Sequence, residues 1–359
     1  MRSLTSQFTI HNSLFIIFHL FFLGVVMTIP KTMKTAVLHT YNHPLTIEEQ
    51  PVPKPGPSEV LIQMAYAPIN PSDLSSLEGR YANPKPLPNT PGMEGSGTVV
   101  AAGKGLLPRL WLGRRVACVA PAGRGGTWAE YLATKAQVCA PLRANITLEQ
   151  GAMMFVNPLS AWAMLDIALT ENHKAIVSTA AASALGRMML RLGQRMNLPI
   201  IHVVRRQEQV DLLQSMGAEH VLISSKPDYE SKLKACCQKL GATLAFDAIA
   251  GSTTFQLAEA LPKGGKVVVY GGLSQEPSVI DPRKLIFEQK SVTGFWLSAW
   301  QRKTSLLKAL RVVGKVQKLL GSDLETAVSA HIPLTNINQG VEQYKNNMTD
   351  GKILLQLNN

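Results

Sequence analysis

A run of small residues between two apolar segments is the first feature of this sequence that could do chemistry. Residues 175–206 read AIVSTAAASALGRMMLRLGQRMNLPIIHVVRR, which predicts a strand, a tight turn, a helix and a second strand at 198–204. The small side chains of the turn would let a pyrophosphate approach the backbone and rest on the first amides of the helix. They are Ala180, Ala181, Ala182, Ser183, Ala184 and Gly186. Because the glycine-rich fingerprint is absent, an ordinary strand-to-helix connection is the alternative.

Two arginines follow the second strand of this unit. NAD-binding domains place an acidic residue there, roughly twenty positions after the turn, to bind the ribose 2′-hydroxyl. This chain has Arg205 and Arg206 instead. Two guanidinium groups can bind a 2′-phosphate through charge-assisted pairs, so the sequence predicts NADP(H). A solvated basic strand end is the simpler alternative.

Composition limits the other kinds of chemistry. The formal charge of +12, from 36 Lys+Arg against 24 Asp+Glu, suits anionic partners such as a phosphate-rich cofactor or an acyl carrier. The basic residues are scattered, which argues against a nucleic-acid partner. The four cysteines have no metal-binding or redox spacing, and we expect idle or buried thiols in a reducing compartment.

Helices and strands continue to alternate after the first unit, and the entry to it is a helix at 159–169. The expected helices are 207–216, 229–240 and 253–261, and the expected strands are 220–223, 244–248, 266–270 and 291–297. This alternation predicts an α/β fold in which residues 158–297 form a doubly wound, Rossmann-type domain with a parallel sheet.

Short strands broken by proline and glycine dominate the chain before that domain. They are expected at 34–39, 46–49, 60–66, 97–101 and 115–119, with a helical piece at 71–79. The pattern predicts a partly open β-barrel domain over 33–157. After a helix containing Leu306, Leu307, Leu310 and Val313, a closing strand at 352–357 is expected to rejoin it, so that 298–359 also belong to this domain.

Residues 1–32 form an extension unlike the rest of the chain. The apolar run 14–27 has the length of a signal-peptide core and is short for a membrane span, and the segment is unlike a mitochondrial presequence. It is an export signal, a membrane anchor or a translated extension upstream of a start at Met33. We favour the extension and a cytoplasmic protein, with membrane association or export as the alternatives.

Several motifs in both halves of the chain resemble the medium-chain dehydrogenase/reductase superfamily, and in particular its zinc-free branch. Where zinc alcohol dehydrogenases have a ligating cysteine, this chain has Asn70 in PINPSD, and where they have Gly-His-Glu it has Gly92-Met93-Glu94. An amide and a thioether do not replace thiolate and imidazole as zinc ligands, so no metal is expected. The resemblance implies a GroES-like domain beside the Rossmann domain.

Three stretches resemble the mitochondrial-type 2-enoyl thioester reductases: VNPLSAWAML at 156–165, YGGLS at 270–274 and GFWLSAW at 294–300. A fourth, GTWAEY at 126–131, is shared with quinone reductases. The chain departs from the family at the AAASALG turn and after Arg205. The resemblance implies cofactor-binding roles for Asn70, Asn157, Ser183, Ala184, Leu185, Gly186, Arg205, Arg206, Tyr270, Gly271, Gly272, Phe295, Trp296, Leu297 and Lys352.

Some of these residues have simpler interpretations. Phe295 and Trp296 would serve as core aromatics at a strand end, and Tyr270-Gly271-Gly272 would be a strand running into a loop. Asn157 precedes a proline and would cap the helix that follows.

Tyr81 matches the position of the family's catalytic tyrosine, in LEGRYANPKP. Reduction of a conjugated C=C bond needs a hydride donor, hydrogen-bond donors for the developing enolate and a proton for the α-carbon. A phenol, with a pKa of about 10, stays protonated near neutrality and can donate. The alternative is a loop tyrosine packed on prolines.

The resemblance therefore implies an NADPH-dependent reductase of 2-enoyl thioesters carried on coenzyme A or an acyl carrier, and a homodimer. The alternatives are an NADPH:quinone oxidoreductase and an NADPH-binding protein without strong activity.

Overall fold

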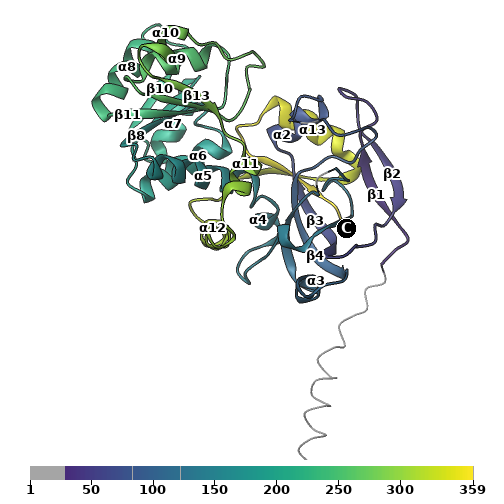
Figure 1. Ribbon diagram of the computed structural model, residues 1–359. Helices are drawn as coiled ribbons and strands as arrows, with labels where there is room; N and C mark the ends of the chain where they lie inside the picture. Colours follow the sequence, from purple (N-terminus) through teal and green to yellow (C-terminus); the bar gives the residue numbers. More distant parts are fainter. Residues whose placement is uncertain (1–28, 83, 122, 359) are drawn as a thin grey trace, which may run out of the picture.

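The computed structural model describes residues 29–82, 84–121 and 123–358, which form two domains side by side (Figure 1). One domain contains the N-terminal strands and the C-terminal strand, and the other contains the middle of the chain. The described chain starts at Ile29, so the apolar run 14–27 lies outside the described residues. Within the described part of the chain, no helix is long and apolar enough to cross a membrane.

The N-terminal domain is built on an open seven-stranded sheet with the order β14-β15-β3-β4-β5-β7, in which β6 also pairs with β3. A separate antiparallel pair, β1 and β2, lies beside it. The strands are β1 (Thr32–Val37), β2 (Thr46–Pro51), β3 (Glu59–Pro68), β4 (Glu94–Ala102), β5 (Arg115–Val119), β6 (Tyr131–Lys135), β7 (Cys139–Pro141), β14 (Val328–Pro333) and β15 (Lys352–Gln356). The helices are α2 (Pro71–Leu77), α3 (Leu106–Trp111), α4 (Leu148–Ala152) and α13 (Ile337–Asn346).

The C-terminal strand returns to this domain as expected. β15 runs antiparallel to β3, with Leu354 opposite Pro68 and Leu355 opposite Ala67. Both leucines are fully buried, so the pairing also closes the hydrophobic core of the domain. The expected partly open barrel is confirmed as an open sheet without closure.

The second domain has six parallel strands in the order β10-β9-β8-β11-β12-β13. The strands are β8 (Ala175–Ser178), β9 (Ile200–Val204), β10 (His220–Ile223), β11 (Ala242–Asp247), β12 (Lys266–Val269) and β13 (Ser291–Gly294). Counted along the chain, this is the 3-2-1-4-5-6 order of a dinucleotide-binding fold, which confirms the Rossmann prediction. The direction of the strand order reverses between β8 and β11, where such folds bind their ligands.

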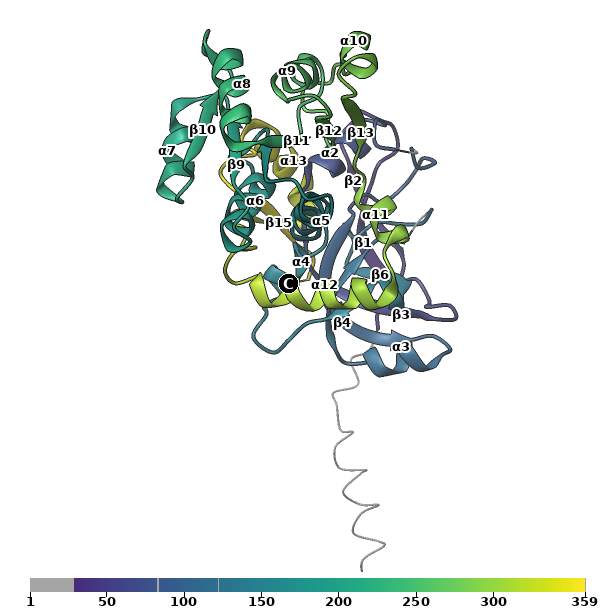
Figure 2. The same ribbon diagram turned by 60° about the vertical axis from the view of Figure 1, so that its left-hand side comes forward.

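Helices cover both faces of this sheet and join the domains. They are α5 (Val156–Thr170), α6 (Ala184–Arg195), α7 (Gln207–Ser215), α8 (Tyr229–Leu240), α9 (Ser252–Ala260), α10 (Pro282–Ile286), α11 (Leu297–Lys303) and α12 (Leu306–Leu319). The face of α6 that carries Met188, Met189 and Leu192 is buried, as the spacing predicts. α5 packs against α6, α11 and α12, and Figure 2 shows α12 below α4 and α5.

Several expected bounds of strands and helices differ from the observed ones, and two of these differences change the extent of a sheet. The strand expected at 291–297 ends at Gly294, because its partner β12 ends at Val269 and the amide of Phe295 makes the last bond, to the Val269 carbonyl at 2.8 Å. The first strand begins at Thr32, opposite Pro51, so the sheet starts before Met33. The elements α3, α4, β6, β7, α10, α11, β14 and α13 were not expected.

Candidate active site

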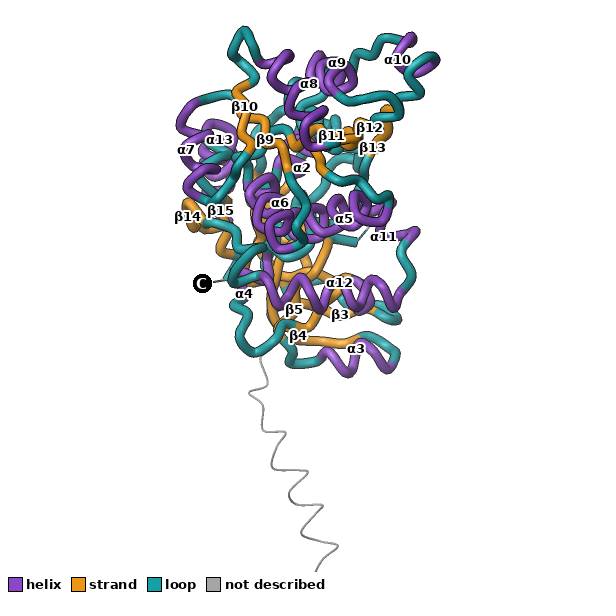
Figure 3. Tube along the Cα trace, turned by 90° about the vertical axis from the view of Figure 1, so that its left-hand side faces the viewer, coloured by secondary structure: helices purple, strands orange, loops and turns teal. Residues whose placement is uncertain are grey.

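Most predicted site residues follow the carboxyl ends of the parallel strands, at the junction between the two domains. Ser183 follows β8, Arg205 follows β9, Tyr270 follows β12 and Trp296 follows β13. Figure 3 shows α5, α6 and α11 between the strands of the two domains. This edge of a doubly wound sheet is where ligands bind.

The turn after β8 has the geometry of a pyrophosphate cradle. Ala180 adopts a left-handed φ of 47°, and Ser183 caps α6 by accepting a hydrogen bond from the Gly186 amide at 3.2 Å. A Cβ atom on Gly186 would lie 2.3 Å from the Ala181 carbonyl oxygen, so only glycine lets the helix approach the turn this closely. The third glycine of the usual fingerprint has the same function. The amides at the start of α6 therefore fit a dinucleotide phosphate, and contact by Ser183, Ala184, Leu185 and Gly186 stays a prediction.

The arginine pair is held in place through its backbone. The Gln209 side-chain oxygen accepts hydrogen bonds from the amides of Arg205 and Arg206 at 3.0 and 3.3 Å. Both side chains are exposed at the end of β9. Among the residues that the structure describes, neither guanidinium group forms an ion pair, so both could receive a 2′-phosphate.

The loop after β12 is fixed by Asp247, which is fully buried at the end of β11. Its carboxylate accepts hydrogen bonds from Thr179 at 3.1 Å and Thr254 at 2.8 Å, and its carbonyl accepts one from the Tyr270 amide at 2.8 Å. A Cβ on Gly271 would lie 2.7 Å from the Ala248 carbonyl oxygen, whereas Gly272 has open space. The Tyr270–Gly272 segment is thus more than a strand end, because its backbone is held against β11 and the residues that follow it.

The three residues after β13 have different environments. Phe295 and Leu297 pack against the hydrophobic core beneath α5, as the simpler interpretation expects for Phe295. Trp296 is 41% exposed instead, and the Arg302 guanidinium lies 4.8 Å from its ring centroid.

Tyr81 meets Trp296 across the domain junction. Tyr81 lies in the loop after α2, and its hydroxyl accepts a hydrogen bond from Trp296 Nε1 at 3.2 Å. Partial burial raises the pKa of the Tyr81 phenol above its usual range; the Trp296 bond opposes this shift and the Asp73 carboxylate adds to it. The phenol therefore keeps its proton at neutral pH and can donate it to a ligand.

Asn70 and Lys352 belong to a buried network behind this site. Lys352, 2% exposed, donates from Nζ to the Asn70 side-chain oxygen and to the Tyr344 hydroxyl at 3.0 Å. The Asn70 side-chain nitrogen, Nδ2, donates to Glu94 Oε1 at 3.1 Å. Both predicted residues are thus enclosed by protein groups, which favours an indirect role for them through the residues around them.

Glu94 links this hydrogen-bonded network to the start of α5. Its second carboxylate oxygen accepts hydrogen bonds from the amides of Phe155 at 2.8 Å and Val156 at 3.0 Å. The carboxylate therefore caps α5, so the interpretation of Asn157 as the cap is wrong: Asn157 lies in the first turn of the helix and is half-buried. Its contact with a nicotinamide stays a prediction.

The place of the zinc site in related folds is occupied by this hydrogen-bonded network. Asn70 bonds Lys352 and Glu94, and the neighbouring Met93 is partly buried. Among the residues that the structure describes, no three or more His, Cys, Asp or Glu side chains gather in a group that could hold a metal. Metal independence remains a prediction.

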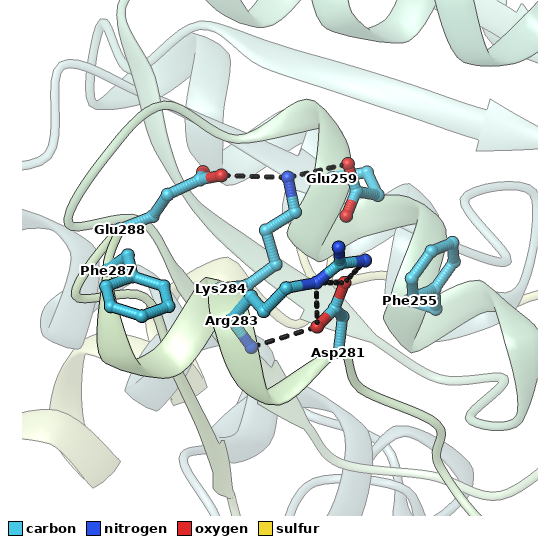
Figure 4. Close-up of a pocket in the computed structure, with 7 residues that line it drawn as sticks. All are labelled: Phe255, Glu259, Asp281, Arg283, Lys284, Phe287 and Glu288. Atoms are coloured by element: carbon cyan, nitrogen blue, oxygen red, sulfur yellow. Dashed lines mark hydrogen bonds and ion pairs between the residues drawn. The ribbon is translucent and has the colours of Figure 1, made fainter.

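A pocket of about 460 Å³ lies elsewhere, between α9 and α10 (Figure 4). Its walls are Phe255, Phe287 and charged residues that pair with one another. Arg283 binds Asp281, and Lys284 binds Glu259 and Glu288. It includes none of the predicted site residues.

Sequence reasoning missed four polar residues at the junction: Asp73, Arg80, Glu94 and Gln275. Asp73 is fully buried, its Oδ2 accepts from the backbone amide of Asn70 at 2.9 Å, and its Oδ1 has no partner among the described residues. Burial raises the pKa of Asp73 to about 7. An aspartate three residues after Asn70 matches a capping pattern, but nothing local signals its burial.

Comparison with known protein families agrees with this geometry. Residues 56–144 match the alcohol dehydrogenase GroES-like domain, and residues 184–311 match the zinc-binding dehydrogenase family.

Individual relatives are similar over most of the chain. The human mitochondrial enoyl-[acyl-carrier-protein] reductase is 32% identical over 260 residues, which is 69% of this chain and 67% of that protein. A crystal structure of a Mesorhizobium loti protein assigned as an NADPH:quinone reductase is 34% identical, covers 92% of this chain and all of its own, and superposes with a TM-score of 0.85. A Bacillus thuringiensis protein with the same assignment is 28% identical, covers 90% of this chain and 99% of its own, and has a TM-score of 0.81.

The fold, the strand order of the parallel sheet, the turn before α6 and the similar proteins all agree. The chain belongs to the medium-chain dehydrogenase/reductase superfamily, in the branch it shares with enoyl reductases and quinone reductases, and is an oxidoreductase that uses a nicotinamide cofactor.

Proposed function

We propose that the protein is an NADPH-dependent reductase of 2-enoyl thioesters, carried on coenzyme A or an acyl carrier. The observation that carries the proposal is Tyr81, whose protonated hydroxyl lies 3.2 Å from Trp296 Nε1 at the domain junction. The relatives named as enoyl-[acyl-carrier-protein] reductases support the same substrate class.

The residues on the β8 and β9 ends fit NADPH. Its pyrophosphate would rest on the α6 amides beside Ser183 and Gly186, and its 2′-phosphate would meet Arg205 and Arg206. Asn157 and the Tyr270–Gly272 segment would face the nicotinamide. When bound, the cofactor supplies the hydride that reaches the β-carbon.

Tyr81 would complete the reaction. As hydride reaches the β-carbon, charge develops on the thioester oxygen, and the phenol can stabilise it by a hydrogen bond or pass its proton to the α-carbon. The raised pKa of Tyr81 suits this role, because the group stays protonated throughout the neutral range. Solvent then returns a proton to the phenolate.

Quinone reduction is the second candidate, because the Mesorhizobium loti relative is assigned to that activity. Both candidates use hydride from NADPH and differ in the source of the proton. Quinone oxygens can be protonated by water, whereas the α-carbon of an enoyl thioester benefits from a positioned acid.

The test is an NADPH-oxidation screen of the purified protein against crotonyl and longer enoyl thioesters, enones and quinones. The proposal expects the highest kcat/KM for an enoyl thioester. A preference for quinones, with enoyl turnover near background, would replace it by the second candidate.

A further inference from the structure

Two neighbouring residues of the loop after α2 each contact the Rossmann domain. Arg80 Nη1 donates to the Gln275 side-chain oxygen at 2.7 Å, and the Tyr81 hydroxyl accepts from Trp296 Nε1 at 3.2 Å. The two partners lie in different loops, after β12 and β13. One stretch of backbone is therefore held from two directions.

The loop is fixed to its own domain at both ends. Gly79 has a left-handed φ of 71°, and a Cβ there would lie 3.0 Å from the Tyr41 ring. The Tyr41 hydroxyl donates to the Lys85 carbonyl at 2.6 Å, so the same tyrosine also holds the far end. Between these points the Arg80 amide donates to the Ser75 carbonyl at 2.8 Å, and the side chains of Arg80 and Tyr81 reach the other domain.

Gln275 is a firm point of attachment. It adopts a left-handed φ of 64°, and its amide donates to the Gly272 carbonyl at 3.0 Å. The preceding residue, Ser274, is bonded through its amide to the Ile249 carbonyl at 2.9 Å. Gln275 thus belongs to the loop that begins at Tyr270, which is tied to β11.

The Arg80 guanidinium is also oriented from its own side. Glu78 accepts a hydrogen bond from Arg80 Nε at 3.1 Å and a second from Nη2. The planar guanidinium therefore presents Nη1 to Gln275 in a fixed direction. The Trp296 bond alone joins two neutral, partly exposed groups and gives a weaker hold on the loop than a charge-assisted bond.

We propose that Arg80 and Gln275 form a latch across the domain junction that positions Tyr81 over the nicotinamide side. This inference rests on the proposed function, since it assigns positioning residues to the same site. Neither residue is a catalytic residue, and both act through the Tyr81 hydroxyl. The alternative for Arg80 is attraction of a phosphate on the thioester carrier.

The kinetic test compares Arg80→Ala, Gln275→Ala and the double variant, each with Tyr81 and with Tyr81→Phe. Each single variant should lower kcat on crotonyl-CoA about three- to tenfold, with NADPH affinity unchanged. The double variant should lose no more than the larger single loss, because both changes open one latch. With Tyr81→Phe, Arg80→Ala should have no further effect. Arg80→Lys keeps a donor and should recover part of the loss.

Arg283→Ala is the matched control, because that exposed arginine also binds a carboxylate but lies on α10, and its kcat should equal that of the parent. The latch would be overturned if the kcat losses of Arg80→Ala and Gln275→Ala were additive in the double variant. It would also be overturned if Arg80→Ala lowered kcat as much in the Tyr81→Phe background as in the parent. The latch would also be overturned if Arg80→Ala raised only the KM of phosphate-bearing thioesters and Gln275→Ala had no effect. That result would show that Arg80 attracts the phosphate of the carrier.

A structural measurement separates failure of the latch from failure of the proposed function. Hydrogen exchange needs no substrate, and in Arg80→Ala and Gln275→Ala the peptides containing residues 80–82 should exchange at least about threefold faster, while those of β15 stay unchanged. If exchange is faster in these variants but the protein is inactive on enoyl thioesters, the latch is supported and the proposed substrate class is wrong. Unchanged exchange would reject the latch whatever the activity.

Discussion

At the scale of single residues, we expect the arginine pair after β9 to determine the cofactor preference. Arg205→Ala and Arg206→Ala should each remove charge-assisted bonds to a 2′-phosphate worth about 1.5–3 kcal/mol, so NADPH affinity should fall about ten- to a hundredfold. NADH affinity should not change. Fluorescence titration with both cofactors measures this, with Arg195→Ala, paired to Asp323 at the far end of α6, as the control. Equal affinities of the parent for NADPH and NADH would contradict the assignment.

The buried Asp73 carboxyl predicts a pH dependence of stability. Its pKa is raised by burial from 3.8 to about 7, so the folded protein holds this proton more tightly than the unfolded chain. The resulting stabilisation is complete below about pH 4 and is lost as the pH rises to about 7. Asp73→Asn keeps the oxygen that accepts from the Asn70 amide and removes this titration.

The melting temperature of Asp73→Asn relative to that of the parent should therefore be higher at pH 8 than at pH 5. Thermal unfolding at the two values measures the difference, and Asp211→Asn on the exposed face of α7 should show none. A parent and an Asp73→Asn variant with parallel pH profiles would show that the carboxyl does not titrate in this range.

At the scale of elements, the turn before α6 depends on close packing. Gly186→Ala places a Cβ 2.3 Å from the Ala181 carbonyl, so the turn must shift. We expect a loss of about 1–3 kcal/mol in unfolding free energy and weaker NADPH binding. Gly314→Ala, in α12 with no atom within 4 Å of the new Cβ, should instead stabilise the protein by about 0.5–1 kcal/mol. Denaturant unfolding compares the two, and a Gly186→Ala variant as stable as the parent would refute the packing argument.

Strongly patterned elements could be predicted from the sequence, and weakly patterned ones could not. The strand at 220–223 and the helix at 229–240 have the predicted bounds, because apolar spacing alone determines them. β7 has only three residues, and β14 buries only one of its six residues. Periodicity cannot detect such elements, and the end of β13 depends on where its neighbour β12 ends.

The same distinction applies to the site. Ser183, Gly186 and Arg205 occupy places that a local strand-turn-helix motif determines, so sequence reasoning could identify them. Arg80 and Gln275 are 195 positions apart, and Glu94 caps a helix 61 positions later. Such contacts arise only when distant parts of the chain come together, so no local sequence pattern predicts them.

At the scale of the whole molecule, β13 offers a surface for a homodimer. It is the last strand of the sheet, Thr293 and Gly294 are exposed, and Phe287 of the preceding loop is 71% exposed. An unpaired edge beside exposed apolar side chains suits a second copy related by a twofold axis. Light scattering should give twice 39.0 kDa, and Phe287→Lys should shift the mass toward one chain. A monomeric parent at micromolar concentration would contradict the homodimer.

The proposed function requires the Tyr81 hydroxyl to act during enoyl reduction. Tyr81→Phe keeps the ring and removes the donor, and general acid catalysis typically contributes 10²–10⁴-fold. Turnover of crotonyl-CoA should fall by about that factor, while NADPH affinity barely changes and quinone turnover falls much less. The deciding measurement is the ratio of enoyl to quinone kcat in Tyr81→Phe and in the parent. A ratio that drops at least about thirtyfold supports this role of Tyr81; enoyl turnover within about threefold of the parent, or equal losses on both substrates, would contradict it.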